Sequence, residues 1–322
     1  MDRVMAGEAT PAQVAAFVVA LRAKGETAGE VAGLAQAMLA LAPHVETPGP
    51  VVDTCGTGGD RAGTINVSTI AAIVAAGAGA IVAKHGNRAA SSRCGSADLL
   101  EALGVHLAMQ PDGVSRCLRE CGIGFMFAPV FHPAMAHAAG PRREMGIPTV
   151  FNFLGPLTNP ARPAGQVVGV ADRRMLPVLA GVLAARGTRG FVVRGDDGLD
   201  EITTTGTSTV IETDGGDVRE YTLDPASLGL PPARPEDLAG GDAAANAGVA
   251  RSVLGGRPGP ARDIVLLNAA AALTVAGKAP DLDGGLALAA ASVDDGRAAA
   301  VLERWIEFSN SSTDPGGNLG PL

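Results

Sequence analysis

Apolar positions in the first 45 residues follow a helical period. One face of the first predicted helix collects four apolar side chains, Val14, Phe17, Val18 and Leu21. Thr10 with Gln13 has the form of a capping box just before this run, and Pro11 suits the first helical position. Thr27 with Glu30 repeats the pattern, so we expect a second helix that ends near residue 41.

From residue 51 the pattern changes, and short apolar runs of strand length alternate with longer helical segments. The predicted strands cover residues 51–53, 80–83, 123–127, 166–171 and 190–193. The predicted helices between them cover residues 68–78, which Asn66 or Ser68 would cap, and 96–103, 113–120 and 175–185. Residues 207–212 and 218–223 form an antiparallel addition, and 236–308 are mostly alanine-rich helix. The alternation indicates an α/β fold with a mainly parallel central sheet flanked by helices, accompanied by a smaller all-helical lobe.

Proline and glycine at positions 48–50 mark the end of the N-terminal helices. Residues 133–159 then interrupt the strand and helix alternation, and we expect this segment to pack against the N-terminal helices. The predicted organisation is a helical lobe of residues 1–48, joined by part of 133–165, and an α/β domain of residues 49–308. The polar, glycine-rich residues 309–322 are expected to form a disordered tail.

The composition narrows the range of partners. The chain has 322 residues, of which 47% are hydrophobic and 18% charged, and this balance is that of a globular protein. A net charge of −8 and a pI of about 5.1 argue against a nucleic-acid partner, because binding a phosphate backbone needs a basic surface. No apolar run reaches the ~18 residues that a membrane span requires, and the first ten residues lack the apolar core of a signal peptide.

Four cysteines in a chain of this length do not make a disulfide scaffold. Cys117 and Cys121 lie four residues apart on a predicted helix, with no further cysteine or histidine nearby to complete a metal-ligand set. We therefore interpret them as core thiols, and expect the protein to reside in a reducing, cytoplasmic setting.

Two glycine-rich turns carry the first candidate chemistry. Residues 56–60 (Gly-Thr-Gly-Gly-Asp) follow the first strand, and residues 84–88 (Lys-His-Gly-Asn-Arg) follow the second. No acidic residue lies between Asp60 and Asp98, whereas that interval holds four basic residues, Arg61, Lys84, Arg88 and Arg93. Glycine lets an anion approach the backbone, and the carboxyl ends of parallel strands share one edge of the sheet. The pattern favours a polyphosphate site over a plain sharp turn, although it matches neither a dinucleotide-binding nor a nucleoside-triphosphate motif.

Two further candidates lie downstream. Asp200 and Glu201 follow the strand at 190–193, and such a pair is either a solvated loop or a magnesium site opposite bound phosphates. Because they lie at a strand end, we favour the magnesium site. Arg142 lies on a predicted helix with His137, Arg143 and Glu144. From spacing alone it is a surface charge or a bidentate partner for a carboxylate, and the residues leave that choice open.

These motifs occur in an order that resembles the anthranilate phosphoribosyltransferase family. The matching segments, between about residues 8 and 308, are GTGGD, NVST, KHGNR, SSRCGSADLLEALG, HPAM with an arginine ten residues after its histidine, FNFLGPLTNP and GLDE. The resemblance implies transfer of the phosphoribosyl group of phosphoribosyl pyrophosphate (PRPP) to the amine of anthranilate, with release of pyrophosphate. This reaction is the second step of tryptophan biosynthesis from chorismate. The resemblance also implies a homodimer formed through the helical lobes.

The resemblance assigns roles motif by motif. The residues expected to bind PRPP are Gly56, Gly58, Gly59, Asp60, Thr64, Asn66, Val67, Ser68, Thr69, Lys84, His85, Gly86, Asn87, Arg88, Ala89, Ala90, Ser91, Ser92 and Ser96. Those expected to contact anthranilate are Gly56, Asn87 and Arg142. Ser68, Asp200 and Glu201 would hold Mg²⁺, with two ions in all and one of them carried by PRPP. Lys84, Asp200 and Glu201 would be the catalytic residues, because they neutralise the departing pyrophosphate.

Some details stay open. The nucleophile is a neutral aromatic amine, and His85 is either a proton acceptor or a structural histidine bonded to a turn carbonyl. The chain departs from the family at Arg194, where histidine is usual, and at Pro148, where arginine is frequent. The alternatives are a pyrimidine nucleoside phosphorylase, an enzyme that uses another aromatic amine, and a non-catalytic regulatory relative.

Overall fold

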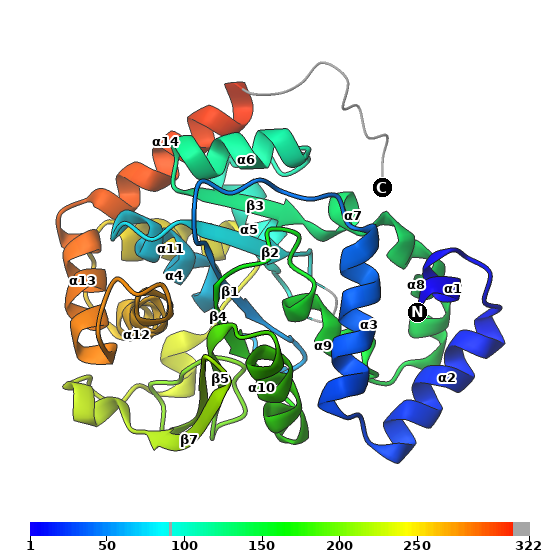
Figure 1. Cartoon of the computed structure of the whole chain (residues 1–322). Helices are drawn as coiled ribbons and strands as arrows, with labels where there is room; N and C mark the ends of the chain where they lie inside the picture. The colour runs from blue at the N-terminus through cyan, green and yellow to red at the C-terminus, as the bar shows by residue number, and fades with distance from the viewer. Residues whose placement is uncertain (90–91, 312–322) are drawn as a thin grey trace.

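The computed structural model describes residues 1–89 and 92–311. A single seven-stranded sheet forms its centre. The N-terminal helices lie together with α8 on one side of this sheet, and the alanine-rich helices from the end of the chain lie on the opposite side (Figure 1). The α/β class expected from the sequence is confirmed.

The helical lobe begins with α1 (Asp2–Met5), α2 (Pro11–Lys24) and α3 (Ala28–Leu41). Both predicted capping boxes form, because the hydroxyls of Thr10 and Thr27 accept hydrogen bonds from the backbone three residues on, each at 3.3 Å. Val14, Val18 and Leu21 are buried as expected. Phe17 is 40% exposed instead, because it lines a surface hollow between α2 and α3.

The segment between the third and fourth strands adds helices to this lobe. Its helices are α7 (Ala128–Phe131), α8 (Ala136–Met145) and α9 (Phe151–Leu154). Ala138 of α8 and Phe151 of α9 share one apolar cluster with Val18 and Val31 of the N-terminal helices. The same cluster continues onto the sheet through Val168, so the lobe and the sheet are packed without a solvent layer between them.

The sheet has the strand order β3-β2-β1-β4-β5-β6-β7. The first five strands pair in parallel, and the last two add an antiparallel hairpin, as the sequence predicts. The strand bounds are β1 Val52–Gly56, β2 Val82–Gly86, β3 Ile123–Phe127, β4 Gly165–Gly169, β5 Arg189–Gly195, β6 Ser208–Asp214 and β7 Asp217–Leu223. Because β1 to β5 are parallel, their carboxyl ends lie at one edge of the sheet.

Helices cover both faces of the sheet. The helices of the larger domain are α4 Val67–Gly77, α5 Ser96–Leu103, α6 Pro111–Glu120, α10 Leu176–Ala185, α11 Ala243–Leu254, α12 Pro260–Val275, α13 Leu282–Asp294 and α14 Arg297–Ser311. Of these, α11, α13 and α14 pack on other helices rather than on the strands. The core of the larger domain lies around α4 and α12, whose side chains are buried along almost their whole length. No helix in the described residues is long and apolar enough to cross a membrane.

Three predicted boundaries were wrong. The first two strands extend into the glycine-rich motifs, because Gly56 pairs with Gly169 of β4 and Gly86 pairs with Phe127 of β3. Lys84 and His85 are therefore strand residues rather than turn residues. The predicted tail also begins too early, since 309–311 belong to α14. There the hydroxyl of Ser309 accepts a hydrogen bond from His106 N at 3.0 Å. The rest of the predicted tail, 312–322, lies outside the described residues.

Candidate active site

The loop after β1 and the loop after β5 meet at the carboxyl edge of the sheet. A Cβ atom built on Gly169 would lie 1.6 Å from the carbonyl oxygen of Asp200, and one on Gly56 would lie 2.2 Å from Asp200 Oδ2. Only glycine permits this approach, so the two strand ends are shaped to receive the acidic loop. Gly58 and Gly59 have φ angles of 68° and 84°, which turn the loop after β1 back over the strand ends.

Backbone amides hold the two carboxylates of the acidic pair. Gly58 N donates to Asp200 Oδ2 at 2.7 Å, across 142 residues of sequence. Ser68 N donates to Glu201 Oε1 at 3.1 Å, and Ser68 lies in the first turn of α4, where the helix dipole favours negative charge. The glycine-rich motif and the acidic pair therefore converge, as the sequence requires of a site that binds phosphate and a cation together.

Burial and neighbouring carboxylates dominate the electrostatics of the pair, although the attraction of Lys84 opposes them at Glu201. Burial, together with the facing Asp60 carboxylate, raises the pKa of Asp200 to about 7. Burial and the neighbouring Asp200 raise the pKa of Glu201 to about 8. Over residues 1–89 and 92–311, no lysine, arginine or histidine forms an ion pair with either carboxylate. Partly buried carboxylates with raised pKa values are stabilised by a bound cation.

Two residues that the sequence reasoning missed brace the acidic loop. Asn268 of α12 is buried, accepts a hydrogen bond from Ile202 N at 3.0 Å and donates one to Ile202 O at 2.9 Å. Asp197 accepts from the hydroxyls of Thr203 and Thr205 and from Leu199 N. These contacts fix the backbone on both sides of the pair. A buried asparagine within an apolar helix was the one available sequence signal.

Arg194, the departure from the family pattern, lies at the end of β5. Its guanidinium donates from Nε to Ala171 O at 3.0 Å and from Nη1 to Gly195 O at 3.1 Å. The side chain thus ties the end of β5 to the segment after β4. Pro148, the other departure, is exposed just before α9.

Lys84 and His85 extend the site along β2. The side chain of Lys84 is 1% exposed, and its ammonium group donates to the carbonyl oxygen of Thr54 on β1. His85 bonds through Nδ1 to Gly155 O at 3.0 Å, the turn-carbonyl contact expected of a structural histidine. Burial and the adjacent His132 lower the pKa of His85 to about 3, which leaves it a weak base near neutral pH.

Asp53 is a fully buried acid that the sequence reasoning did not single out. It accepts hydrogen bonds from His85 N at 3.2 Å and from Asn159 Nδ2 at 2.8 Å. Burial raises the pKa of Asp53, while attraction to Lys84 opposes that rise. Asp53 and Asn159 together fix the backbone of β2 directly behind Lys84.

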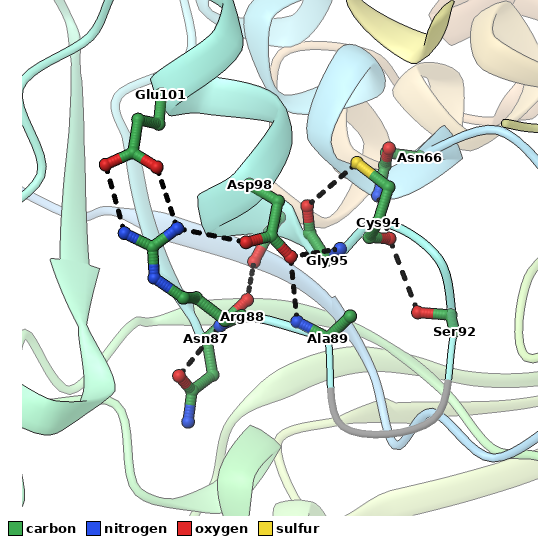
Figure 2. Close-up of polar contacts among 10 residues, drawn as sticks. Asn66, Asn87, Arg88, Ala89, Ser92, Cys94, Gly95, Asp98 and Glu101 are labelled. Carbon is green, nitrogen blue, oxygen red and sulfur yellow. Dashed lines mark hydrogen bonds and ion pairs between the residues drawn. The ribbon is translucent and has the colours of Figure 1, made fainter. Parts of the chain in front are cut away.

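The loop between β2 and α5 is held by polar contacts drawn in Figure 2. Ser96 Oγ donates to Asn87 O at 3.1 Å, and Arg88 lies against Asp98 and Glu101 of α5. Asn66 occupies the cap position of α4, but its side chain donates to Cys94 O at 3.0 Å and does not cap the helix. The expected cap interaction was wrong, because this side chain links α4 to the loop. Ala90 and Ser91, both expected to bind PRPP, lie outside the described residues.

Arg142 lies on α8, apart from the strand ends. It is partly buried, and burial lowers its pKa. Its guanidinium stacks over the ring of Phe151 at 5.6 Å from the centroid. The described part of the chain offers it no carboxylate and no hydrogen-bond acceptor. A half-buried guanidinium that is stacked yet unpaired suits a carboxylate supplied from outside the protein.

Comparisons with known proteins agree with this geometry. Residues 48–299 match the α/β domain of a glycosyl transferase family, and residues 1–42 match the helical bundle domain of the same family. Anthranilate phosphoribosyltransferase from Saccharopolyspora erythraea is 59% identical over 314 residues, covering 96% of this chain and 90% of that protein. The chain belongs to the anthranilate phosphoribosyltransferase family. The Arthrobacter sp. enzyme of the same name is also 59% identical, over 315 residues with 96% and 90% coverage.

Solved structures of the family superpose closely on this chain. The anthranilate phosphoribosyltransferase of Thermus thermophilus gives a TM-score of 0.92 at 47% identity, covering 96% of this chain and 93% of that one. The Saccharomyces cerevisiae enzyme, in complex with PRPP and Mg, gives 0.86 at 32% identity, covering 94% and 86%. The likeness extends over both the helical and the α/β parts.

The carboxylate oxygens at the strand edge fit magnesium, the ion bound with PRPP in the Saccharomyces cerevisiae structure. Mg²⁺ takes oxygen ligands, and it is commonly held by one or two carboxylates plus substrate phosphates. Asp200 and Glu201 each keep one carboxylate oxygen that no backbone amide occupies. No cluster of three or more histidine, cysteine or acidic side chains suited to a metal occurs in the described ranges. A site completed by phosphate oxygens is therefore the arrangement that these residues favour.

Proposed function

We propose that this chain transfers the phosphoribosyl group of PRPP to the amine of anthranilate and releases pyrophosphate, the second step of tryptophan biosynthesis from chorismate. Relatives at 59% identity over 96% of the chain carry this name. The observation that carries the proposal is the 2.7 Å hydrogen bond from Gly58 N to Asp200, which joins the glycine-rich turn to the acidic pair.

The donor site is proposed at the carboxyl ends of β1 and β2. Its residues are Gly56, Gly58, Gly59, Asp60, Thr64, Asn66, Val67, Ser68, Thr69, Lys84, His85, Gly86, Asn87, Ala89, Ala90, Ser91, Ser92 and Ser96. The amides at the start of α4 and the buried ammonium of Lys84 supply positive potential for the phosphates. Arg88, the remaining residue of the motif, is treated below.

Magnesium is proposed to lie between the acidic pair and the donor, held by Asp200, Glu201 and the hydroxyl of Ser68. Two ions are proposed, one of which arrives with PRPP. When bound, Mg²⁺ neutralises negative charge that develops on the pyrophosphate leaving group. The Asp200 carboxylate is held by Gly58 N, and the backbone on either side of the acidic pair is held by Asn268 and Asp197. The acids are therefore in position before the donor binds, and little reorganisation is needed at the reacting centre.

The acceptor is proposed to bind between Gly56, Asn87 and Arg142. The guanidinium of Arg142 would pair with the carboxylate of anthranilate, which directs the amine towards the ribose. The amine is neutral and attacks an anomeric carbon with oxocarbenium character, so no strong base precedes the step. The low pKa of His85 supports a structural role over proton transfer. Orientation of two bound substrates supplies the remaining rate enhancement.

The assembly is proposed to be a homodimer formed through the helical lobe of residues 1–48 with part of 133–165, packed on the α/β domain of 49–308. The exposed Phe17 and an adjacent hollow of about 340 Å³ on α2 and α3 support this surface. A cytoplasmic location is proposed because the four cysteines are free thiols.

The function is tested by following fluorescent phosphoribosylanthranilate with PRPP, Mg²⁺ and anthranilate, beside thymidine phosphorolysis. We expect turnover only in the first assay. Thymidine cleavage would favour the pyrimidine nucleoside phosphorylase alternative. Turnover of another aromatic amine at a higher kcat/KM would favour an enzyme of the same chemistry with a different acceptor. Rescue of a tryptophan auxotroph that lacks this step tests the role in cells, and failure in every assay would support the regulatory alternative.

A further inference from the structure

The guanidinium of Arg88 is already occupied by protein carboxylates. Its Nη1 donates to Asp98 Oδ1 at 3.0 Å and to Glu101 Oε2 at 2.8 Å, and its Nη2 donates to Glu101 Oε1 at 3.0 Å. The group also stacks over the ring of Phe127, 5.7 Å from its centroid. Figure 2 shows the guanidinium lying between Asp98 and Glu101, with three of its five N–H groups engaged.

Asp98 accepts hydrogen bonds from both ends of the loop that follows β2. One of its carboxylate oxygens accepts from Ala89 N at 2.9 Å and from Gly95 N at 2.8 Å, and the other accepts from Arg88. Asp98 lies in the first turn of α5, where the helix dipole stabilises a carboxylate. A single side chain therefore ties the start and the end of the loop to one helix terminus.

The backbone at this closure leaves no room for a side chain. A Cβ atom on Gly95 would lie 2.4 Å from Ala89 N and 2.8 Å from Asn87 O. Ala97 N also donates to Asn87 O at 3.2 Å. The position of Asn87, which is proposed to contact both substrates, thus depends on how α5 holds this loop.

The charges of the cluster argue against a direct phosphate contact. Arg88 brings one positive charge, and Asp98 and Glu101 bring two negative charges, so the cluster is net negative. Attraction to Arg88 lowers the pKa of Glu101, which keeps that carboxylate ionised. If Arg88 turned towards the pyrophosphate, it would leave two unpaired carboxylates close to a polyanion, and like charges repel.

We propose that Arg88 is a positioning residue for the phosphoribosyl donor and not one of its phosphate ligands. With Asp98 and Glu101 it forms a clamp, here called the α5 clamp, that holds the backbone of Asn87 and Ala89 at the end of β2. The proposal rests on the proposed function, since it assigns a role within the donor site.

The two roles predict opposite effects when the acidic partners are changed. If Arg88 positions the loop, Glu101→Gln weakens the clamp and raises KM for PRPP about threefold, in the same direction as the ~10-fold rise expected for Arg88→Gln. The double variant then behaves like Arg88→Gln alone, because both changes break one network. If Arg88 binds phosphate, Glu101→Gln frees the guanidinium and lowers KM for PRPP or leaves it unchanged. That result would overturn the proposal.

Arg88→Lys sharpens the distinction. Lysine keeps the charge but cannot make the bidentate contact with Glu101, so the clamp predicts a KM for PRPP close to that of Arg88→Gln. A phosphate ligand predicts that lysine restores most of the affinity, which would contradict the clamp. KM for anthranilate should rise in the same direction but by less than KM for PRPP, because the clamp also positions Asn87, which is proposed to contact both substrates.

A readout independent of turnover completes the test. Amide hydrogen exchange at Ala89 and Gly95 should become faster in Arg88→Gln and Asp98→Asn, without substrate present. The matched control is Arg251→Gln, which removes an exposed ion pair with Glu303 and a contact to the far end of α5 at Leu103. It should leave both amides and KM for PRPP unchanged. Unaltered exchange in Arg88→Gln would refute the clamp.

The design separates this proposal from the proposed function. Calorimetric titration of each variant with PRPP and Mg²⁺ reports donor binding even if the wild type does not use anthranilate. Weaker donor binding in Glu101→Gln supports the clamp, whatever the acceptor, and unchanged or tighter binding contradicts it. Glu101 has a side chain that is 58% exposed, so this variant is expected to fold.

Discussion

Two groups of carboxylates flank the proposed donor site, and their surroundings are opposite. Asp98 and Glu101 lie on α5, where both form ion pairs with Arg88. Asp200 and Glu201 are partly buried at the strand edge, where backbone amides of Gly58 and Ser68 hold them and no described residue forms an ion pair with them. Hydrogen bonds from Arg88 lower the pKa of Glu101, whereas burial and repulsion by neighbouring carboxylates (Asp60 for Asp200, Asp200 for Glu201) raise the pKa values of Asp200 and Glu201.

Asp98 and Glu101 are already neutralised by a protein arginine, whereas Asp200 and Glu201 have no ion-pair partner among the described residues. A satisfied surface pair has little to gain from a bound ion. A partly buried carboxylate pair without an ion-pair partner lowers its free energy when it binds a cation. The comparison therefore supports the proposal that magnesium binds at Asp200 and Glu201, and that Asp98 and Glu101 have a structural role.

The largest expected effect comes from removing the unpaired acids. Asp200→Asn with Glu201→Gln should lower kcat/KM by ~1,000-fold or more, because metal stabilisation is worth several kcal/mol. The same variant should melt at a higher temperature than the wild type without Mg²⁺ at pH 8, since two buried charges are gone. Rates measured across a Mg²⁺ titration, with calorimetric melting, check both results. A Mg²⁺ dependence like that of the wild type would remove the pair from the metal site.

The glycines beneath the acidic loop come next. A methyl group at Gly169 would collide with the backbone of Asp200, so Gly169→Ala should displace the loop and lower kcat/KM by ~100-fold. The melting temperature should also fall. The control is Gly248→Ala on the exposed side of α11, where a Cβ meets nothing within 4 Å and alanine should stabilise slightly. If kcat/KM and the melting temperature were the same in the two variants, the close approach of Gly169 to Asp200 would not matter for activity.

Arg142 extends the comparison to a positively charged side chain that has no ion-pair partner among the described residues. Arg142→Ala should lower kcat/KM for anthranilate by about 10- to 100-fold, as the loss of a charge-assisted hydrogen bond implies, with a smaller change for PRPP. The neighbouring exposed Arg143 is the control, and Arg143→Ala should leave both constants near the wild-type values. Equal losses for the two substrates would argue against a contact with the anthranilate carboxylate.

The smallest effect is on stability against pH, and its sign differs between the two groups. The pKa values of Asp200 and Glu201 rise from 3.8 and 4.5 to about 7 and about 8 on folding. Their contribution is therefore complete below pH ~4 and is lost as the pH rises through 7 to 8. We expect the Mg²⁺-free protein to lose a few degrees of melting temperature between pH 6 and pH 8.5.

The pH dependence of stability expected from the α5 clamp has the opposite sign. The pKa of Glu101 is lowered on folding, so its contribution is present above the ordinary carboxylate pKa and is lost as the pH falls below it. In Asp200→Asn with Glu201→Gln the alkaline decline should disappear, while in Glu101→Gln it should persist. An alkaline decline that survives in the double variant would place its origin elsewhere.

The sequence predicted the α/β class and most of the elements, because strand-length apolar runs and capping boxes are local signals. It misplaced the ends of β1 and β2, where the pairing partners are β4 and β3, more than 30 residues away. Strands that end in glycine and polar residues look like turns when those partners are not visible.

For the site, the sequence identified the glycine-rich turn and the acidic pair. It could not show which charged side chains form ion pairs with other residues of the protein. Arg88 looked like a phosphate ligand because no acid lies between Asp60 and Asp98. The acids that neutralise it lie just past that interval, one helical turn apart on α5. Asn268, 67 residues beyond the acidic pair, had no local signal that connected it to Ile202.

The most direct test of the metal site is a crystal structure with Mn²⁺ and PRPP, in which the metal is located by anomalous scattering. The account predicts a peak about 2.1 Å from a carboxylate oxygen of Asp200 or Glu201, and its loss in Asp200→Asn with Glu201→Gln. A metal bound by phosphate oxygens alone, with both carboxylates remote from it, would contradict the assignment.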